Sequence, residues 1–341
     1  MVREHLFPFW EEDRVRRRGP ESEQAPRLPF VRRHARAFCC CFSRRFAFCP
    51  MGWGNSWLAD SEGLPMSSGV DATQFKFDHT AVAARYDELL VPRLFRPWAA
   101  LLLDQLQLRG GEVVVDVATG PGTLAGMAAE RVGSAGKVIA ADISAPMLQI
   151  ARSKPSLAAS APIEYLECAA APLLVPDGVA DVVVCQQGLQ FFPDPLEALR
   201  EMWRVLKPRG RLGITVWSNL QSCTIWSAYH SALATTQLDD LAQLLLAPFS
   251  WGSLESLRKA VTLAGFRQVV ASTPSLPIVF EGGERQVFDA LFAQPVGPPI
   301  QALPDATRQR LRAALAKQTA PMMADGRVQA TMTSHLAIAE K

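Results

Sequence analysis

A short apolar run that breaks at two glycines is the feature that most constrains this 341-residue chain. Residues 113–115 are all valine, as a buried parallel strand requires, and Gly120 and Gly122 follow where the chain must turn sharply into a helix. Glycine also lets a backbone approach a ligand closely. A second apolar segment, 138–141, ends in Asp142, whose carboxylate can accept hydrogen bonds from both hydroxyls of a ribose. The pattern predicts half of a nucleoside-cofactor pocket.

Two classes of cofactor are compatible with this layout. The run from Gly120 to Ala125 fits the dinucleotide fingerprint G-x-G-x-x-G/A, and Asp142 follows Gly120 by 22 residues, close to the spacing in NAD-binding proteins. Asp116 argues against NAD, because a carboxylate at the end of the first strand would repel a pyrophosphate near the helix N-terminus. S-adenosylmethionine carries a sulfonium and an ammonium and no phosphate. The sequence therefore favours S-adenosylmethionine.

Four motifs resemble, in order and spacing, those of class I S-adenosylmethionine-dependent methyltransferases. They are Asp116-x-Ala118-x-Gly120-x-Gly122, the segment from Asp142 to Met147, the segment from Asp181 to Phe192 and the segment from Glu201 to Gly210. The nearest branch is the bacterial-type small-molecule methyltransferases related to the ubiquinone and menaquinone C-methyltransferases. The resemblance extends over about residues 75–341. It implies an enzyme that transfers a methyl group to a small, lipophilic acceptor.

The resemblance also implies a set of cofactor-binding residues. Gly120 and Gly122 would approach the cofactor through their backbone, and Asp142 would bind the ribose. The full expected set is Asp116, Ala118, Gly120, Gly122, Asp142, Ile143, Met147, Ala169, Ala170 and Gln186. Of these, Asp116 would orient the glycine loop, and Ile143 and Met147 would pack against adenine. Two alternatives stay open, since Met147 also suits a core position and either Asp142 or Ser144 also suits a helix N-cap.

Two positions depart from the family pattern. Ala118 stands where the family's first glycine is usual, and Ala169 stands where the family usually has an aspartate that accepts a hydrogen bond from the adenine amine. Losing such a bond costs about 0.5–1.5 kcal/mol, which weakens binding by up to roughly tenfold. The two departures motivate an alternative hypothesis, a catalytically silent protein of the same fold that binds or assembles with a partner. The NAD-dependent oxidoreductase is the other alternative, but it leaves Asp116 and the later motifs unexplained.

Methyl transfer to such an acceptor is an in-line displacement, for which the protein supplies alignment and a dry site. Alignment at about 3 Å can supply roughly 7–11 kcal/mol of the barrier. A base is needed when the acceptor must lose a proton, and the candidates are Tyr86, His79, Gln190 and His230. Tyr86 is also suited to closing over the cofactor. Four aromatic residues suit an apolar acceptor pocket or ordinary core equally well: Phe191, Phe192, Trp217 and Trp226.

The alternation of apolar strands and helices predicts an α/β fold, a Rossmann-like, doubly wound, mostly parallel sheet. Helices are expected near 76–90 and 94–107, and a mainly helical stretch at 222–247 is expected to form an inserted substrate roof. The resemblance implies seven strands in the order 3-2-1-4-5-7-6. The antiparallel seventh strand would be the terminal segment near 334–339.

The domain organisation follows from composition. Residues 1–65 hold eleven arginines, no lysine and four of the seven cysteines, and we expect a disordered leader. Its acidic residues disfavour a mitochondrial or plastid presequence, and three consecutive cysteines disfavour a zinc site. Residues 66–341 would form the methyltransferase domain, with the cofactor half at about 75–217 and the acceptor side at about 218–341.

Charge and hydropathy exclude some classes of partner. The formal net charge is +2, which disfavours nucleic acid, and no run of 18 apolar residues predicts a transmembrane helix. The three cysteines beyond residue 65 are isolated, so a reducing, cytoplasmic compartment is expected. The partner expected is a small-molecule acceptor, and the sequence specifies neither its identity nor the oligomeric state.

Overall fold

The computed structural model describes residues 77–341, and a long helical stretch opens this part of the chain. Helix α1 (Thr80–Arg85) continues into a π-helix (Tyr86–Phe95) and then into α2 (Arg96–Leu106). The sequence predicted two separate helices here. Pro92 explains the difference, because it lacks an N–H donor and a wider π-helical turn accommodates it without ending the helix. The predicted leader, residues 1–65, lies outside the described residues.

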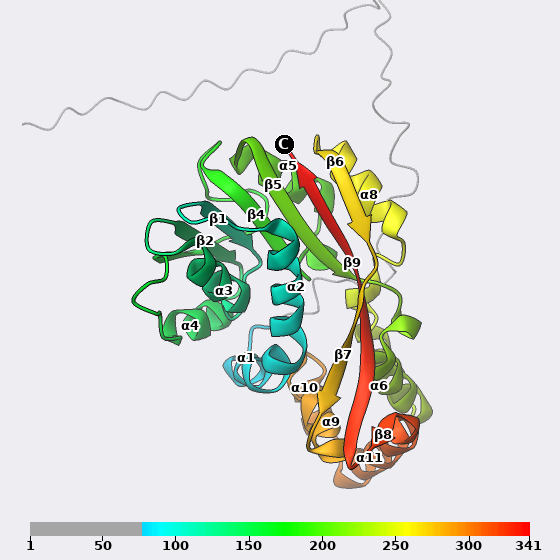
Figure 1. Ribbon diagram of the computed structural model, residues 1–341. Helices are drawn as coiled ribbons and strands as arrows, with labels where there is room; N and C mark the ends of the chain where they lie inside the picture. The colour runs from blue at the N-terminus through cyan, green and yellow to red at the C-terminus, as the bar shows by residue number, and fades with distance from the viewer. Residues whose placement is uncertain (1–76) are drawn as a thin grey trace, which may run out of the picture. The chain divides into compact units, whose positions relative to one another are not determined.

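A twisted sheet runs through the described part of the chain (Figure 1). Its strands, in spatial order, are β3 (Ile163–Glu167), β2 (Lys137–Asp142), β1 (Val113–Val117), β4 (Ala180–Gln186), β5 (Leu206–Trp217), β9 (Arg327–Glu340) and β6 (Arg267–Ser272). β1 to β5 pair in parallel, and β9 is antiparallel to both of its neighbours. The predicted fold class is confirmed, and the observed order is the expected 3-2-1-4-5-7-6 with β9 as the seventh strand.

Helices cover both faces of this sheet. Successive strand residues point to opposite faces, so Val114 packs in one core with Leu102 of α2 and Ala128 of α3 (Thr123–Val132). Val115 packs in a second core with Leu199 of α5 (Pro195–Val205), and α8 (Leu254–Leu263) also lies there. Helix α4 (Ala145–Ser153) follows β2. The strands are therefore buried on both sides, as their continuous apolar runs predict.

The terminal strand β9 is longer than predicted and belongs to two sheets. Residues 334–340 pair with β5, whereas residues 327–333 pair with β7 (Ser275–Phe280) and β8 (Met323–Ala324). The sequence analysis missed β7 and β8 and began the last strand near residue 334. β7 pairs with a segment about fifty residues away, and β8 is only two residues long. Local sequence patterns reveal neither kind of strand.

Five helices pack with β7 and the first half of β9 into what we call the helical lobe. They are α6 (Thr224–Thr235), α7 (Asp239–Leu244), α9 (Gly283–Leu291), α10 (Gly297–Gln301) and α11 (Asp305–Thr319). The lobe shares a core with Leu90 and Leu94 of the π-helix and with Trp217 at the end of β5. It therefore lies beyond the carboxyl end of β5 (Figure 1). None of the helices within residues 77–341 has the length and apolar character that a membrane span requires.

Candidate functional site

The direction of strand order reverses between β1 and β4, which are neighbours in the sheet although β2 and β3 separate them in sequence. Ligands of open parallel sheets bind outside the carboxyl ends of the strands at such a point. Asp116 and the glycine turn follow the end of β1, Asp142 ends β2, and Gln186 ends β4. The structure therefore brings the main residues of the predicted set to one edge of the sheet.

The glycine loop has a left-handed backbone at three positions. The φ angles are +59° at Ala118, +55° at Gly120 and +76° at Gly122. A Cβ atom on Gly122 would lie 2.8 Å from the Cβ of Ala151, so this position requires glycine for space as well as for conformation. A Cβ atom on Gly120 would meet nothing within 4 Å, which leaves its backbone open to a ligand.

Asp142 links this loop to the end of β2. One carboxylate oxygen, Oδ2, accepts a hydrogen bond of 2.7 Å from the Gly120 N–H, and Oδ1 accepts one of 2.8 Å from the Ser144 N–H. Burial raises the pKa of Asp142 although these backbone bonds oppose the rise. Each carboxylate oxygen has a second lone pair, so the side chain can still accept hydrogen bonds from two hydroxyls.

Asp116 is a second buried carboxylate at the same edge, 1% exposed. Its Oδ2 accepts a hydrogen bond of 2.6 Å from the Thr119 hydroxyl. The pKa of Asp116 is raised to about 7, chiefly by burial and also by the nearby charge of Asp142, against the lowering effect of the hydrogen bond from Thr119. No ion pair within residues 77–341 includes Asp116 or Asp142. The site thus holds two carboxylates with no cationic side chain paired to either.

The first described residues fold over this edge of the sheet. The Ser144 hydroxyl donates a 2.9 Å hydrogen bond to the Phe77 carbonyl and also caps α4, so Ser144 and not Asp142 is the N-cap. Tyr86 stacks on Phe95 with ring centroids 4.7 Å apart and meets Phe77 edge-on at 4.9 Å. Burial raises the pKa of Tyr86 well above its usual value, and the charge of Asp142 raises it further. The phenol therefore stays protonated.

The expected adenine-side residues differ in exposure. Ile143 is 76% exposed and presents an apolar side chain, whereas Met147 is 4% exposed, as a core residue would be. Ala169 and Ala170 are half-buried, and the Cys168 N–H just before them donates to the Asp142 carbonyl at 3.0 Å. The segment is therefore held beside the end of β2.

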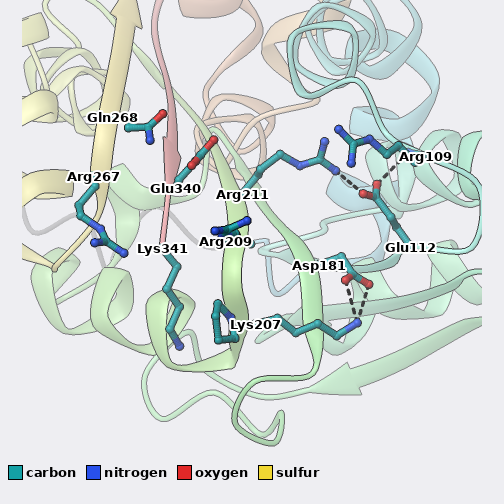
Figure 2. A pocket seen from close by; sticks show the side chains of 12 residues that line it. Arg109, Glu112, Asp181, Lys207, Arg209, Arg211, Arg267, Gln268, Glu340 and Lys341 are labelled. Carbon is teal, nitrogen blue, oxygen red and sulfur yellow. Dashed lines mark hydrogen bonds and ion pairs between the residues drawn. The ribbon is translucent and has the colours of Figure 1, made fainter.

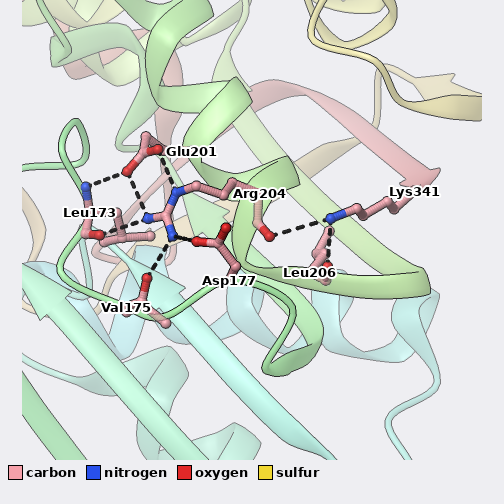
Figure 3. Close-up of polar contacts among 7 residues, drawn as sticks. All are labelled: Leu173, Val175, Asp177, Glu201, Arg204, Leu206 and Lys341. Atoms are coloured by element: carbon pink, nitrogen blue, oxygen red, sulfur yellow. Dashed lines mark hydrogen bonds and ion pairs between the residues drawn. The ribbon is translucent and has the colours of Figure 1, made fainter.

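Arg204 of α5 fixes the loop that continues from this segment (Figure 3). Its guanidinium donates to the carbonyls of Leu173 and Val175, both at 2.9 Å, and pairs with Asp177 and Glu201. The Glu201 carboxylate in turn accepts a 2.8 Å bond from the Leu173 N–H. The sequence analysis did not identify Arg204 as a site-supporting residue, because three of its four partners lie in a loop 27 to 31 residues earlier in the chain.

The last residue of β4 and the residues just after it carry amide side chains with different partners. Gln186 donates to the Phe95 carbonyl at 2.8 Å, and Gln187 donates to the Ser334 hydroxyl at 2.9 Å. Gln190 is 4% exposed, and within the described residues neither of its carboxamide atoms has a partner. Of the two candidate histidines, His79 is exposed at the start of α1, two residues after Phe77, and His230 is on α6 of the helical lobe.

The family model and the curated relatives agree on one family. Residues 72–246 match the ubiE/COQ5 methyltransferase family. A segment of 153 residues is 37% identical to the ubiquinone/menaquinone biosynthesis C-methyltransferase UbiE of Hahella chejuensis, covering 44% of this chain and 61% of that relative. The protein of the same name from Enterobacter sp. (strain 638) is 36% identical over 142 residues, covering 40% and 57%. The chain thus spans about three fifths of the length of these relatives.

Among solved structures, the YcgJ protein of Bacillus subtilis superposes with a TM-score of 0.47 at 16% identity, over 71% of this chain and 97% of that one.

Proposed function

The chain belongs to the ubiE/COQ5 methyltransferase family, and from this premise we propose that it is an S-adenosylmethionine-dependent methyltransferase with a small, lipophilic acceptor. The observation that carries the choice of cofactor is the pair of buried carboxylates, Asp116 and Asp142, beside the glycine loop with no cationic side chain paired to them. A pyrophosphate placed there would meet repulsion, whereas a ligand with a sulfonium and an ammonium would be attracted. This disfavours the NAD-dependent alternative.

We assign the cofactor contacts as follows. Asp142 holds the ribose hydroxyls with its free lone pairs, and the exposed Ile143 side chain covers one face of adenine. Asp116 acts through Thr119 to fix the loop of Ala118, Gly120 and Gly122. The remaining assigned contacts are Met147, Ala169, Ala170 and Gln186. When bound, the cofactor supplies an activated methyl group on a sulfonium, so the protein needs to align the acceptor and exclude water.

The acceptor side is assigned to the residues that face the helical lobe. The rings of Tyr86, Phe95 and Trp217 form a continuous row, since Phe95 and Trp217 lie with centroids 6.2 Å apart. Such a row suits a lipophilic, planar acceptor. Gln190 offers a donor and an acceptor in one buried carboxamide, and we assign it to a polar oxygen of the acceptor. Tyr86 closes over the cofactor and is not the base, because its pKa lies well above neutrality.

The test is a calorimetric titration of the full chain with S-adenosylmethionine, S-adenosylhomocysteine and NAD, followed by a screen of lipophilic phenols, quinones and acids for methylated product. We expect saturable binding of the first two ligands and turnover of at least one acceptor class. Binding without turnover of any acceptor would favour the catalytically silent alternative, to which Ala118 and Ala169 point. Binding of NAD alone would overturn the assignment.

An Asp142→Ala variant tests the ribose assignment. Two charge-assisted hydrogen bonds at about 1.5 kcal/mol each imply a loss of affinity of about a hundredfold or more for S-adenosylmethionine. The matched control is Asp104→Ala, because the Asp104 side chain is 67% exposed on α2 and its removal should leave affinity unchanged. Wild-type affinity in the Asp142 variant would remove the central contact of the proposed site.

A further inference from the structure

A basic cavity of about 820 Å³ lies at the end of the parallel strands opposite to Asp116 and Asp142 (Figure 2). It is lined by residues around the beginnings of β1, β4 and β6, by the start of β5 and by the end of β9. Six cationic side chains contribute to it: Arg109, Lys207, Arg209, Arg211, Arg267 and Lys341. We call this the basic pocket. Its place at the amino ends of β1 and β4 separates it from Asp116 and Asp142, which lie at the carboxyl ends.

Three carboxylates also line the basic pocket, and two of them are already neutralised. Arg211 pairs with Glu112 at 2.6 Å, and Lys207 contacts both oxygens of Asp181 at 2.8 Å. Figure 2 shows these two ion pairs on one side of Arg209. Glu340 is the third carboxylate. The remaining side chains therefore leave the pocket with a positive charge, which persists even when an α-carboxylate at Lys341 is counted.

Three guanidinium groups and the Lys341 ammonium of the basic pocket are in no ion pair within the described residues, and the guanidinium groups are the ones left to bind a ligand. No ion pair within residues 77–341 includes Arg109, Arg209 or Arg267. The Lys341 ammonium, in contrast, is held by the carbonyls of Arg204 and Leu206 at 3.3 and 2.7 Å (Figure 3). Guanidinium presents forked N–H donors that match the geometry of phosphate oxygens.

The backbone around these arginines is held in unfavourable conformations. Arg209, near the start of β5 and just before Gly210, has a φ of +64°. Gln268, beside Arg267 in a bulge of β6, has a φ of +52°. Arg211 and Arg267 are both in register with Glu340 across β9, so the three side chains share one face of the sheet. Non-glycine residues with positive φ are uncommon, and a fraction of them lie at functional sites.

We propose that the basic pocket is a binding site for a phosphate-bearing anion, held by the guanidinium groups of Arg209 and Arg267. A cavity of about 820 Å³ can hold a compound of small-molecule size. The site is separate from the proposed methyl-transfer site and does not depend on that assignment. A soluble phosphate compound and a phospholipid headgroup share this chemistry, and the experiment below distinguishes the two.

The first arm titrates the full chain with inorganic pyrophosphate by calorimetry at low and at physiological ionic strength. We expect saturable binding that weakens with salt. Arg209→Gly and Arg267→Gln should each weaken binding by about tenfold. Arg209→Gly is chosen because glycine accepts the positive φ, so the variant should fold. The matched control is Arg285→Gln, which removes the same charge from an exposed position on α9.

The second arm sediments the protein with vesicles of phosphatidylcholine, with and without phosphatidic acid. Sedimentation with the acidic vesicles that pyrophosphate reverses would assign the site to a lipid headgroup. Pyrophosphate binding without sedimentation would assign it to a soluble compound, and both results support the proposal. Because residues 1–65 contain eleven arginines, the point variants and not the bare affinity decide the outcome. Unchanged binding in both arginine variants, an equal loss in the Arg285→Gln control, or no saturable binding of either probe would overturn it.

Discussion

At the scale of single residues, Ala118 and Gly188 compete for the same space. Ala118 has a φ of +59°, a conformation that favours glycine, whereas Gly188 has a φ of −101° that any residue can adopt. A Cβ atom on Gly188 would lie 2.6 Å from the Ala118 Cβ and 2.9 Å from the Cys185 Sγ. Close packing therefore allows a methyl group at one of these positions and not at both.

We predict opposite effects for the two single substitutions and a partial rescue in the double variant. Ala118→Gly should raise the free energy of unfolding by up to about 1 kcal/mol, because it removes the left-handed strain. Gly188→Ala should lower it by about 1–3 kcal/mol through overpacking. In the double variant the free energy of unfolding should fall by less than the sum of the two single effects. Urea unfolding of the wild type and the three variants measures this difference. Strict additivity would show that the two positions do not share this space.

Asp116 should make stability depend on pH. Its pKa is about 7 in the folded protein and about 3.9 in an unfolded chain, so the folded state binds the proton more tightly. The stabilising contribution is therefore complete below about pH 4 and is lost as the pH rises towards about 7. Between pH 5 and 8 this loss amounts to about 2–3 kcal/mol.

The measurement compares urea unfolding of the wild type and of Asp116→Asn at pH 5 and pH 8. The carboxamide stays neutral at both values and can still accept the hydrogen bond from Thr119. We expect the variant to gain stability relative to the wild type as the pH rises, whereas Asp104→Asn, at an exposed position, should follow the wild type. If the free energies of unfolding of the wild type and Asp116→Asn differ by the same amount at pH 5 and pH 8, Asp116 is already ionised at pH 5.

Sequence reasoning located Asp116, Gly120 and Asp142 at one edge of the sheet because the ends of neighbouring parallel strands must meet there. It could not say which hydrogen bonds each side chain makes. Gln186 is bound to the Phe95 carbonyl, and this partner lies 91 positions away. Ser144, by contrast, is followed by Ala145 and Pro146, and a serine before a proline in the first turn is typical of an N-cap.

At the scale of elements, Arg204 of α5 determines the position of the loop that follows β3. Arg204→Met removes the donors to the Leu173 and Val175 carbonyls and should lower the free energy of unfolding by about 2–3 kcal/mol. It should also weaken cofactor binding, because the loop continues directly from Ala169 and Ala170. Hydrogen exchange should accelerate in residues 171–179 before it accelerates in the sheet.

Arg200→Met is the matched control for this variant. It lies one turn earlier on the same helix, is 55% exposed and has a surface pair of 3.4 Å with Glu197. Such a pair contributes about 0–1 kcal/mol, so the control should change little. If both variants lose stability equally, the effect comes from a change in the helix and not from the hydrogen bonds between Arg204 and the loop.

The elements that sequence predicted well are those whose pattern is local. From their apolar spacing the sequence predicts helices at 122–133, 252–264 and 305–318, and α3, α8 and α11 lie close to these limits. Of the three, α8 also has a side-chain N-cap, Ser253. β7 contains Pro277, which argues against a strand interior, and it forms because β9 is available as a partner. Pairing of this kind depends on tertiary contacts, which a short window of sequence does not contain.

At the scale of the whole molecule, Ser334 lies where β9 passes from the parallel sheet into the helical lobe. It is in register with Trp217 of β5, whereas the preceding Thr333 is in register with Ser275 of β7. The Ser334 hydroxyl donates to the Val216 carbonyl at 2.7 Å and accepts from Gln187 at 2.9 Å. One buried hydroxyl thus joins the end of β4, the end of β5 and the strand that both sheets share.

Ser334→Ala should therefore destabilise the two sheets together. The Gln187 carboxamide oxygen already has no partner within the described residues, and the substitution removes the partner of its nitrogen as well. We expect this loss to lower the free energy of unfolding by about 1–3 kcal/mol. Hydrogen exchange should speed up in β5 and in β7 by the same factor, because each is paired to β9. Ser272→Ala, at an exposed position on β6, should leave both rates unchanged. Faster exchange in β7 alone would show that the helical lobe opens independently of the parallel sheet, and that the continuity of β9 does not make their unfolding cooperative.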